Sequence, residues 1–227
     1  MLVRIPDLLT REETAHCLSV LKSADWVDGK VTAGIQSATA KHNLQVPETA
    51  PQARQLGEII LTALGKNPLF NSAALPLRVF PPLFNRYDAG MRFDAHVDNA
   101  IRFVRGANIR MRTDVSVTLF LSQPSDYDGG ELLIEDTYGS QSVKLPAGSA
   151  VLYPATSLHR VARIARGSRW ASFFWVQSMV KDDGERRELF ELDQAIQETR
   201  AALGDEHHAA VALTASYHNL LRRWSEI

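Results

Sequence analysis

Two histidines, one aspartate and one arginine are the residues whose types and spacing could support chemistry. His96 and Asp98 stand two residues apart, His159 follows 61 residues after Asp98, and Arg169 lies ten residues beyond His159. Residues i and i+2 of an extended strand point the same way, so His96 and Asp98 could close on one metal ion. Two imidazoles and a carboxylate form the facial triad of a non-heme Fe(II) centre, which leaves positions open for a cosubstrate and O₂. Arg169 offers a planar fork for the far carboxylate of a dicarboxylate.

The elements that must position these residues are short strands. From Leu75 to Val180 the sequence consists of β-rich runs that are broken by Gly, Pro and Asp. Eight strands with turn signals at this spacing predict a β-sandwich or jelly roll. The expected strands are 77–87, 94–98, 113–121, 131–135, 142–145, 150–153, 159–164 and 169–178.

Strand parity predicts which side chains face the interior. In 169–178, Arg169, Ala171 and Trp175 share one face of the strand. If Arg169 points into the interior, the other two side chains therefore do so as well. Ala171 then leaves room for a ligand, and Trp175 can form a wall of the pocket. In 113–121 the even-numbered residues are mixed in character, and the odd-numbered residues from Val115 to Leu121 are aliphatic. The mixed set suits a ligand-lined interior, and the aliphatic set suits packing under other elements.

The N-terminal third, 1–74, is expected to be a mainly helical support region. Thr10 and Glu13 form a capping box ahead of a helix. The segment 52–64 reads as a second helix that Gly65 closes.

The C-terminal segment 181–227 is expected to be an αα-hairpin. Apolar residues recur at helical spacing until Gly204, and Asp205 is expected to cap a second helix. The hairpin could dock on the barrel or pair between chains. We expect pairing into a homo-oligomer, because Phe190 and Trp224 add apolar surface that needs cover.

Composition narrows the classes of function. The chain has 227 residues, of which 45% are hydrophobic and 22% charged, as in ordinary globular proteins. A net charge of −1 gives no support for nucleic-acid binding. A single cysteine, Cys17, excludes a disulfide framework and a cysteine-based metal site. No signal peptide or membrane span is apparent, so a cytoplasmic protein is expected.

The segment 99–112 is expected to be a mobile lid over the metal site. It contains four arginines and no acidic residue, although the chain is slightly acidic. The lid would select an anionic or polar substrate, with Arg102 and Arg105 as contacts alongside Trp175. The alternative is a solvated basic loop.

The motifs together resemble a known family. The chain is similar to the bacterial PKHD-type hydroxylases, which are relatives of the prolyl and lysyl hydroxylases among the Fe(II)/2-oxoglutarate-dependent dioxygenases. Some bacterial members are associated with iron uptake. The resemblance covers the whole chain, and the matching stretches are 83–87, 96–99, 127–132, 151–154, 158–159 and 169–175.

The resemblance implies a fold and a reaction. The fold would be mainly β with flanking helices (α+β), with a double-stranded β-helix, or jelly roll, over 75–180. His96, Asp98 and His159 would bind Fe(II), Arg169 would hold the C5 carboxylate of 2-oxoglutarate, and the Tyr87 hydroxyl would reach the cosubstrate. The enzyme would hydroxylate a protein side chain, a peptide or a small metabolite and release succinate and CO₂. Ascorbate would keep the iron reduced.

Two other classes of function remain open at this point. A cupin-like isomerase or hydrolase could use Zn²⁺ at the same three ligands, without needing Arg169. A non-catalytic interaction module could retain the same fold, although the intact triad argues against it.

Overall fold

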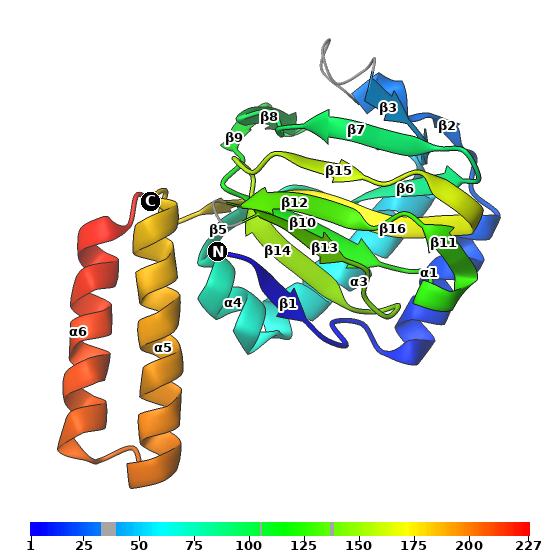
Figure 1. The fold of residues 1–227 in the computed structure, drawn as a ribbon. Coiled ribbons are helices and arrows are strands. Elements are labelled where there is room, and N and C mark those ends of the chain that lie inside the picture. The colour runs from blue at the N-terminus through cyan, green and yellow to red at the C-terminus, as the bar shows by residue number, and fades with distance from the viewer. Residues whose placement is uncertain (33–39, 105, 137–138) are drawn as a thin grey trace.

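Two antiparallel sheets packed face to face form the centre of the molecule, a computed structural model that describes residues 1–32, 40–104, 106–136 and 139–227 (Figure 1). The larger sheet has the order β1 (Val3–Ile5), β14 (Ala150–Pro154), β10 (Val115–Phe120), β16 (Ile164–Ser178), β6 (Leu83–Asp88), β4 (Leu44–Gln45) and β2 (Val27–Asp28). β5 (Pro76–Val79) and β11 (Tyr127–Gly129) also pair with β16. The smaller sheet has the order β13 (Gly139–Val143), β12 (Leu132–Asp136), β15 (His159–Val161), β7 (Arg92–His96) and β3 (Lys41–His42).

Helices cover the outer face of the larger sheet, and two more extend from its end (Figure 1). The covering helices are α1 (Arg11–Lys22), α3 (Pro51–Lys66) and α4 (Pro68–Ala74). The C-terminal pair is α5 (Asp183–Leu203) and α6 (His208–Trp224), and short 3₁₀ turns lie at η1 (Gly29–Thr32) and η2 (Pro124–Asp126). No helix in the described ranges is long and apolar enough to cross a membrane.

The mainly β fold with flanking helices is confirmed. The predicted orientation of the odd-numbered and even-numbered side chains of β10 is confirmed as well. The odd-numbered Val115, Val117 and Leu119 join the core between the larger sheet and the helices. A second core lies between the sheets, where Phe120 and Tyr153 meet Ile134 of the smaller sheet. The even-numbered residues of β10 therefore face the interior, as predicted. The division into 1–74, 75–180 and 181–227 stays a prediction, and strands of the first segment complete both sheets.

Several element boundaries differ from the expected ones. The stretch 77–87 is two strands, β5 and β6, because Pro81 and Pro82 lack the N–H group that a continuous ladder needs. Gly65 lies inside α3, which ends at Lys66. Asn67 then caps α4, since its side chain accepts a hydrogen bond from the Phe70 amide.

The cap of α6 also differs from the expected one. His207 caps this helix, because its Nδ1 accepts a hydrogen bond from the backbone amide of Ala209. Asp205 instead pairs with Arg200 at 2.6 Å. The capping box at Thr10 and the end of α5 at Gly204 are confirmed.

The helical hairpin docks through its base and projects at its tip (Figure 1). At the base, Leu189 is buried with Leu75 and Val180, and Trp224 packs against them. The backbone amide of Glu226 donates to Met179 at 2.7 Å, which ties the chain's end to the barrel. The projecting part exposes Leu203 and Val211 near the turn between α5 and α6.

The segment expected to be a lid is a β-hairpin of β8 (Ile101–Val104) and β9 (Ile109–Arg112). Met111 is buried beside Trp175, with Val104 packed against them. Ile101 and Phe103 are exposed. The inner face of the hairpin is thus seated on the barrel, and its mobility stays a prediction.

Candidate metal centre and cosubstrate pocket

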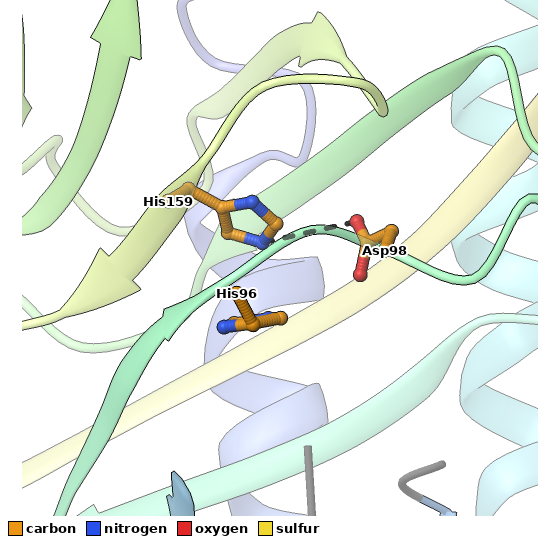
Figure 2. A group of neighbouring side chains, drawn as sticks. All are labelled: His96, Asp98 and His159. Carbon is orange, nitrogen blue, oxygen red and sulfur yellow. Dashed lines mark ion pairs between the residues drawn. The ribbon is translucent and has the colours of Figure 1, made fainter. Parts of the chain in front are cut away.

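His96, Asp98 and His159 come together at one end of the smaller sheet (Figure 2). His96 ends β7, His159 begins β15, and the two residues are direct partners in the ladder. The candidate ligand atoms of the three residues all lie within 4.8 Å of one another, and His159 Nε2 is 3.8 Å from Asp98 Oδ2. Asp98 lies beyond the end of β7, so the expected strand over 94–98 is too long.

A β-bulge turns His96 inward. His159 pairs with His96 and Val161 pairs with Phe93, so three steps along β7 match two steps along β15. Such a bulge re-aims side chains and often lies next to an active site. It places Phe93 and His96 on the same face, where their rings stack with centroids 3.6 Å apart. Without the extra residue, these two side chains would point to opposite sides of the sheet.

Hydrogen bonds orient both imidazoles. Nδ1 of His96 lies 2.9 Å from the Asp94 carbonyl, and Nδ1 of His159 lies 3.0 Å from the Ser157 carbonyl. A carbonyl can only accept, so each Nδ1 carries the proton and each Nε2 offers a lone pair. Burial and the neighbouring His159 lower the pKa of His96 to about 4, which keeps this ring neutral.

The Asp98 carboxylate is held from the opposite sheet. Ser116 of β10 donates its hydroxyl to Asp98 Oδ2 at 2.6 Å. This contact joins an even-numbered residue of the larger sheet to the loop after β7. Carboxylates that bind metal ions are usually hydrogen-bonded in turn, which fixes their orientation.

Arg169 lies deep between the sheets with 1% of its surface exposed. It pairs across the ladder with Tyr87, and its guanidinium carbon lies 5.6 Å from the Tyr87 ring centroid and 5.1 Å from that of Phe120. Its Nε is buried without a hydrogen-bond partner, and no carboxylate in the described part of the chain forms an ion pair with it. A buried cation is costly unless an anion accompanies it. The arrangement therefore fits an anionic ligand.

Phenol groups surround this cation. Burial raises the pKa of Tyr87 to about 12, while the charge of Arg169 opposes that rise. Burial also raises the pKa values of Tyr127 and Tyr153, with Arg169 again acting in the opposite direction. All three phenols are therefore neutral at ordinary pH and can donate hydrogen bonds to an anion.

Comparisons with known proteins agree with this geometry. The family model for the PKHD-type hydroxylase C-terminal domain matches residues 183–226, and that for the 2OG-Fe(II) oxygenase superfamily matches residues 82–177. A PKHD-type hydroxylase of Gluconobacter oxydans is 65% identical over 227 residues, which is 100% of each chain. The chain belongs to the PKHD-type hydroxylase family. The PKHD-type hydroxylase PiuC of Pseudomonas aeruginosa is 58% identical over 227 residues, also 100% of each chain.

Solved structures share the fold at low identity. A prolyl-4-hydroxylase from Pseudomonas putida matches with a TM-score of 0.52 and 22% identity, covering 78% of this chain and 92% of that one. HygX from Streptomyces hygroscopicus, solved with nickel and 2-oxoglutarate bound, matches with a TM-score of 0.53 and 15% identity. It covers 78% of this chain and 82% of HygX. These neighbours support the predicted jelly-roll fold.

This PKHD-type hydroxylase is therefore an Fe(II)- and 2-oxoglutarate-dependent dioxygenase, with 2-oxoglutarate and O₂ as cosubstrates. The predicted family, fold and reaction class are confirmed. The zinc isomerase or hydrolase and the interaction module, both left open by the sequence, are not supported.

The hydroxylase pocket includes a lysine that sequence reasoning missed. Lys41 of β3 lines the pocket with His96 and Asp98, and only 4% of its surface is exposed. Burial and, to a smaller extent, the charge of Arg102 lower its pKa to about 7, while the charges of Asp98 and Asp28 oppose this fall. Because β3 has only two residues, the sequence shows no alternation of apolar and polar residues from which the inward orientation of Lys41 could be predicted.

Two of the three predicted substrate contacts, Arg102 and Trp175, line the pocket. Trp175 lines the pocket, as strand parity predicted, and the guanidinium carbon of Arg102 lies 4.1 Å from its ring centroid. Arg105 lies outside the described residues. Arg112, at the far end of the hairpin, instead pairs with Asp114 at 2.6 Å and Glu226 at 3.2 Å. Only Arg102 of these arginines therefore lines the pocket in the described part of the chain.

Proposed function

We propose that His96, Asp98 and His159 hold the Fe(II) of this dioxygenase and that Arg169 binds the C5 carboxylate of 2-oxoglutarate. The observation that carries the proposal is the buried guanidinium of Arg169, which lines the same pocket as the triad and has no carboxylate partner in the described ranges. When bound, iron and 2-oxoglutarate would supply the oxidative chemistry that hydroxylates a C–H bond and yields succinate and CO₂.

The protein's part is to orient these groups and keep water away. Asp98 contributes the negative charge that helps retain a divalent cation, and the two histidines must be neutral to ligate. Tyr87, opposite Arg169, is proposed to donate its hydroxyl to the cosubstrate carboxylate. The aromatic walls formed by Phe173 and Trp175 limit access of bulk water to the open side of the triad.

Substrate contacts, reductant and location complete the proposal. We propose Arg102, Arg105 and Trp175 as contacts for the hydroxylated substrate, which is a protein side chain, a peptide or a small metabolite. Ascorbate is proposed as the reductant of the iron. A cytoplasmic location is proposed because the one cysteine, Cys17, is buried and unpaired, as suits a reducing compartment.

Anaerobic titration of the metal-free protein with Fe(II) and 2-oxoglutarate tests the proposal. A 2-oxoglutarate molecule chelated to Fe(II) produces a weak visible charge-transfer band, and we expect that band to saturate at one equivalent of each component. Zn²⁺ in place of Fe(II) serves as the control and should give no band. Failure of Fe(II) and 2-oxoglutarate to produce a band in the wild-type protein would contradict the proposed site.

Removing the Ser116 hydroxyl should weaken iron binding. In Ser116→Ala, Asp98 loses the 2.6 Å hydrogen bond that fixes its carboxylate. Loss of such outer partners typically costs roughly 10- to 100-fold in metal affinity, and we expect that range here. The apparent dissociation constant for Fe(II), read from the visible band, measures the effect.

Ser172→Ala is the matched control for this change. Ser172 is also buried, but its hydroxyl donates to the Leu83 carbonyl, and it does not line the pocket. This variant should lose some stability and keep the wild-type affinity for Fe(II). Equal affinities in the Ser116 and Ser172 variants would mean that Asp98 does not depend on Ser116.

We also propose that the projecting part of the helical hairpin pairs with a second copy of the chain. Leu203 and Val211 are 55% and 56% exposed near the turn between α5 and α6. A Leu203→Glu/Val211→Glu variant should therefore be monomeric by light scattering, while the wild type is larger. These substitutions leave the docked base around Leu189 intact, whereas truncation after Val180 would uncover it. The same oligomeric state for both proteins would refute the pairing.

A further inference from the structure

Two basic side chains from different elements line the pocket of the proposed iron site. Lys41 comes from β3 at the edge of the smaller sheet, and Arg102 comes from the β8–β9 hairpin. Both line the pocket that contains His96, Asp98 and Arg169. The charges of Arg102, Asp98 and Asp28 all act on Lys41, so the charge of Lys41 depends on its neighbours in and beside the pocket.

Aromatic rings hold both cations in place. The Lys41 ammonium lies 5.4 Å from the ring centroid of Phe93 and 5.5 Å from that of Phe173. The Arg102 guanidinium carbon lies 4.1 Å from the ring centroid of Trp175 and 5.1 Å from that of Phe80. Cations at these distances from ring faces are attracted to them. Both side chains are thereby positioned at the pocket instead of extending into solvent.

The charges of the loaded pocket do not cancel. The two positive charges of Fe(II) would balance the two negative charges of 2-oxoglutarate, and Asp98 would balance Arg169. Among the lining residues, the Arg102 guanidinium and the protonated form of Lys41 then remain positive, and Asp28, which also acts on Lys41, lies outside the lining. A surplus of one sign in a concave site attracts a ligand of the opposite sign. The substrate that completes the site should therefore be anionic.

Apolar side chains line the same pocket. Val97, which lies between two of the triad residues, lines it and is 47% exposed. Phe93, Phe173 and Trp175 line it as well. Ligand pockets are typically lined by apolar and aromatic side chains, with a few polar groups that fix the orientation of the ligand. The part of the pocket next to the cations is therefore suited to an apolar group.

We infer that Lys41 and Arg102 form a substrate subsite that takes the oxyanion, such as a carboxylate, of a small organic molecule whose apolar body lies against the apolar side chains that line the pocket. This inference rests on the proposed function, because the charge balance assumes iron and 2-oxoglutarate in the same pocket. It assigns a binding role to Lys41 and a charge to the unidentified substrate.

Calorimetry on the anaerobic protein loaded with Fe(II) and saturating 2-oxoglutarate tests the inference. Phenylacetate and phenylacetamide serve as probes, since they share an apolar body and differ in charge. We expect phenylacetate to bind the wild type about tenfold more tightly, as a charge-assisted hydrogen bond implies. Lys41→Met and Arg102→Gln should each remove most of this preference, and Lys41→Arg should keep it.

Arg110→Gln is the matched control, because Arg110 lies on the same hairpin and is exposed. This variant should bind both probes as the wild type does. Equal binding of the two probes to the wild type, or displacement of phenylacetate by excess 2-oxoglutarate, would overturn the inference. So would an equal loss of preference in Arg110→Gln and Arg102→Gln. The visible Fe(II)–2-oxoglutarate band distinguishes failure of this inference from failure of the proposed function. Absence of the band from the wild-type protein would refute the proposed function.

Discussion

A His159→Ala protein is expected to lose more than about 100-fold of its hydroxylase activity, since even outer partners of a metal ligand are worth roughly 10- to 100-fold. His159 is buried, and its Nε2 lies 3.8 Å from the Asp98 carboxylate, so it would supply one of three protein bonds to the metal. Ala at His96 or at Asp98 should have the same effect. Succinate formation from 2-oxoglutarate at saturating Fe(II) measures the loss, and thermal unfolding checks that the fold persists.

His42→Ala provides the control for these triad variants. His42 is exposed on β3, at the edge of the same smaller sheet, and lies outside the cluster of candidate ligands. We expect wild-type turnover from this protein. Full turnover by His159→Ala under saturating iron would show that the metal is held by a different set of residues.

Replacing Arg169 with Lys is expected to raise the KM for 2-oxoglutarate by about 10- to 150-fold, with a much smaller change in Fe(II) affinity. An arginine can hold a carboxylate through two parallel hydrogen bonds, which a lysine ammonium cannot reproduce. The loss of one charge-assisted hydrogen bond costs roughly 1.5–3 kcal/mol, which corresponds to the stated range. Initial rates of succinate formation against 2-oxoglutarate concentration measure the change.

Arg166→Lys is the corresponding control on the same strand. Arg166 is exposed and pairs with Asp128 at 2.7 Å near the surface, away from the pocket. Its substitution should leave the KM for 2-oxoglutarate unchanged. If Arg169→Lys also keeps the wild-type KM, another residue binds the cosubstrate carboxylate.

The sequence by itself determined the class of the fold and the identity of the candidate metal cluster. Strand parity is a local property, because successive side chains alternate between faces. It correctly placed Trp175 at the pocket and the aliphatic residues of β10 in the outer core. The spacing of His96, Asp98 and His159 was recognisable without coordinates, and the structure brings these three residues together. Their roles, and that of Arg169, stay predictions for the variants above.

Only the tertiary structure decided how these side chains are aimed and what surrounds them. The bulge that turns His96 inward depends on the pairing of β7 with β15, whose partner residues are far apart in the chain. Lys41 belongs to a two-residue strand, which is too short for a periodic pattern to show its inward orientation. The contact of Ser116 with Asp98 and the docking of the hairpin base around Leu189 likewise join distant segments. Local patterns predict the face on which a residue lies, whereas packing between distant segments determines its neighbours.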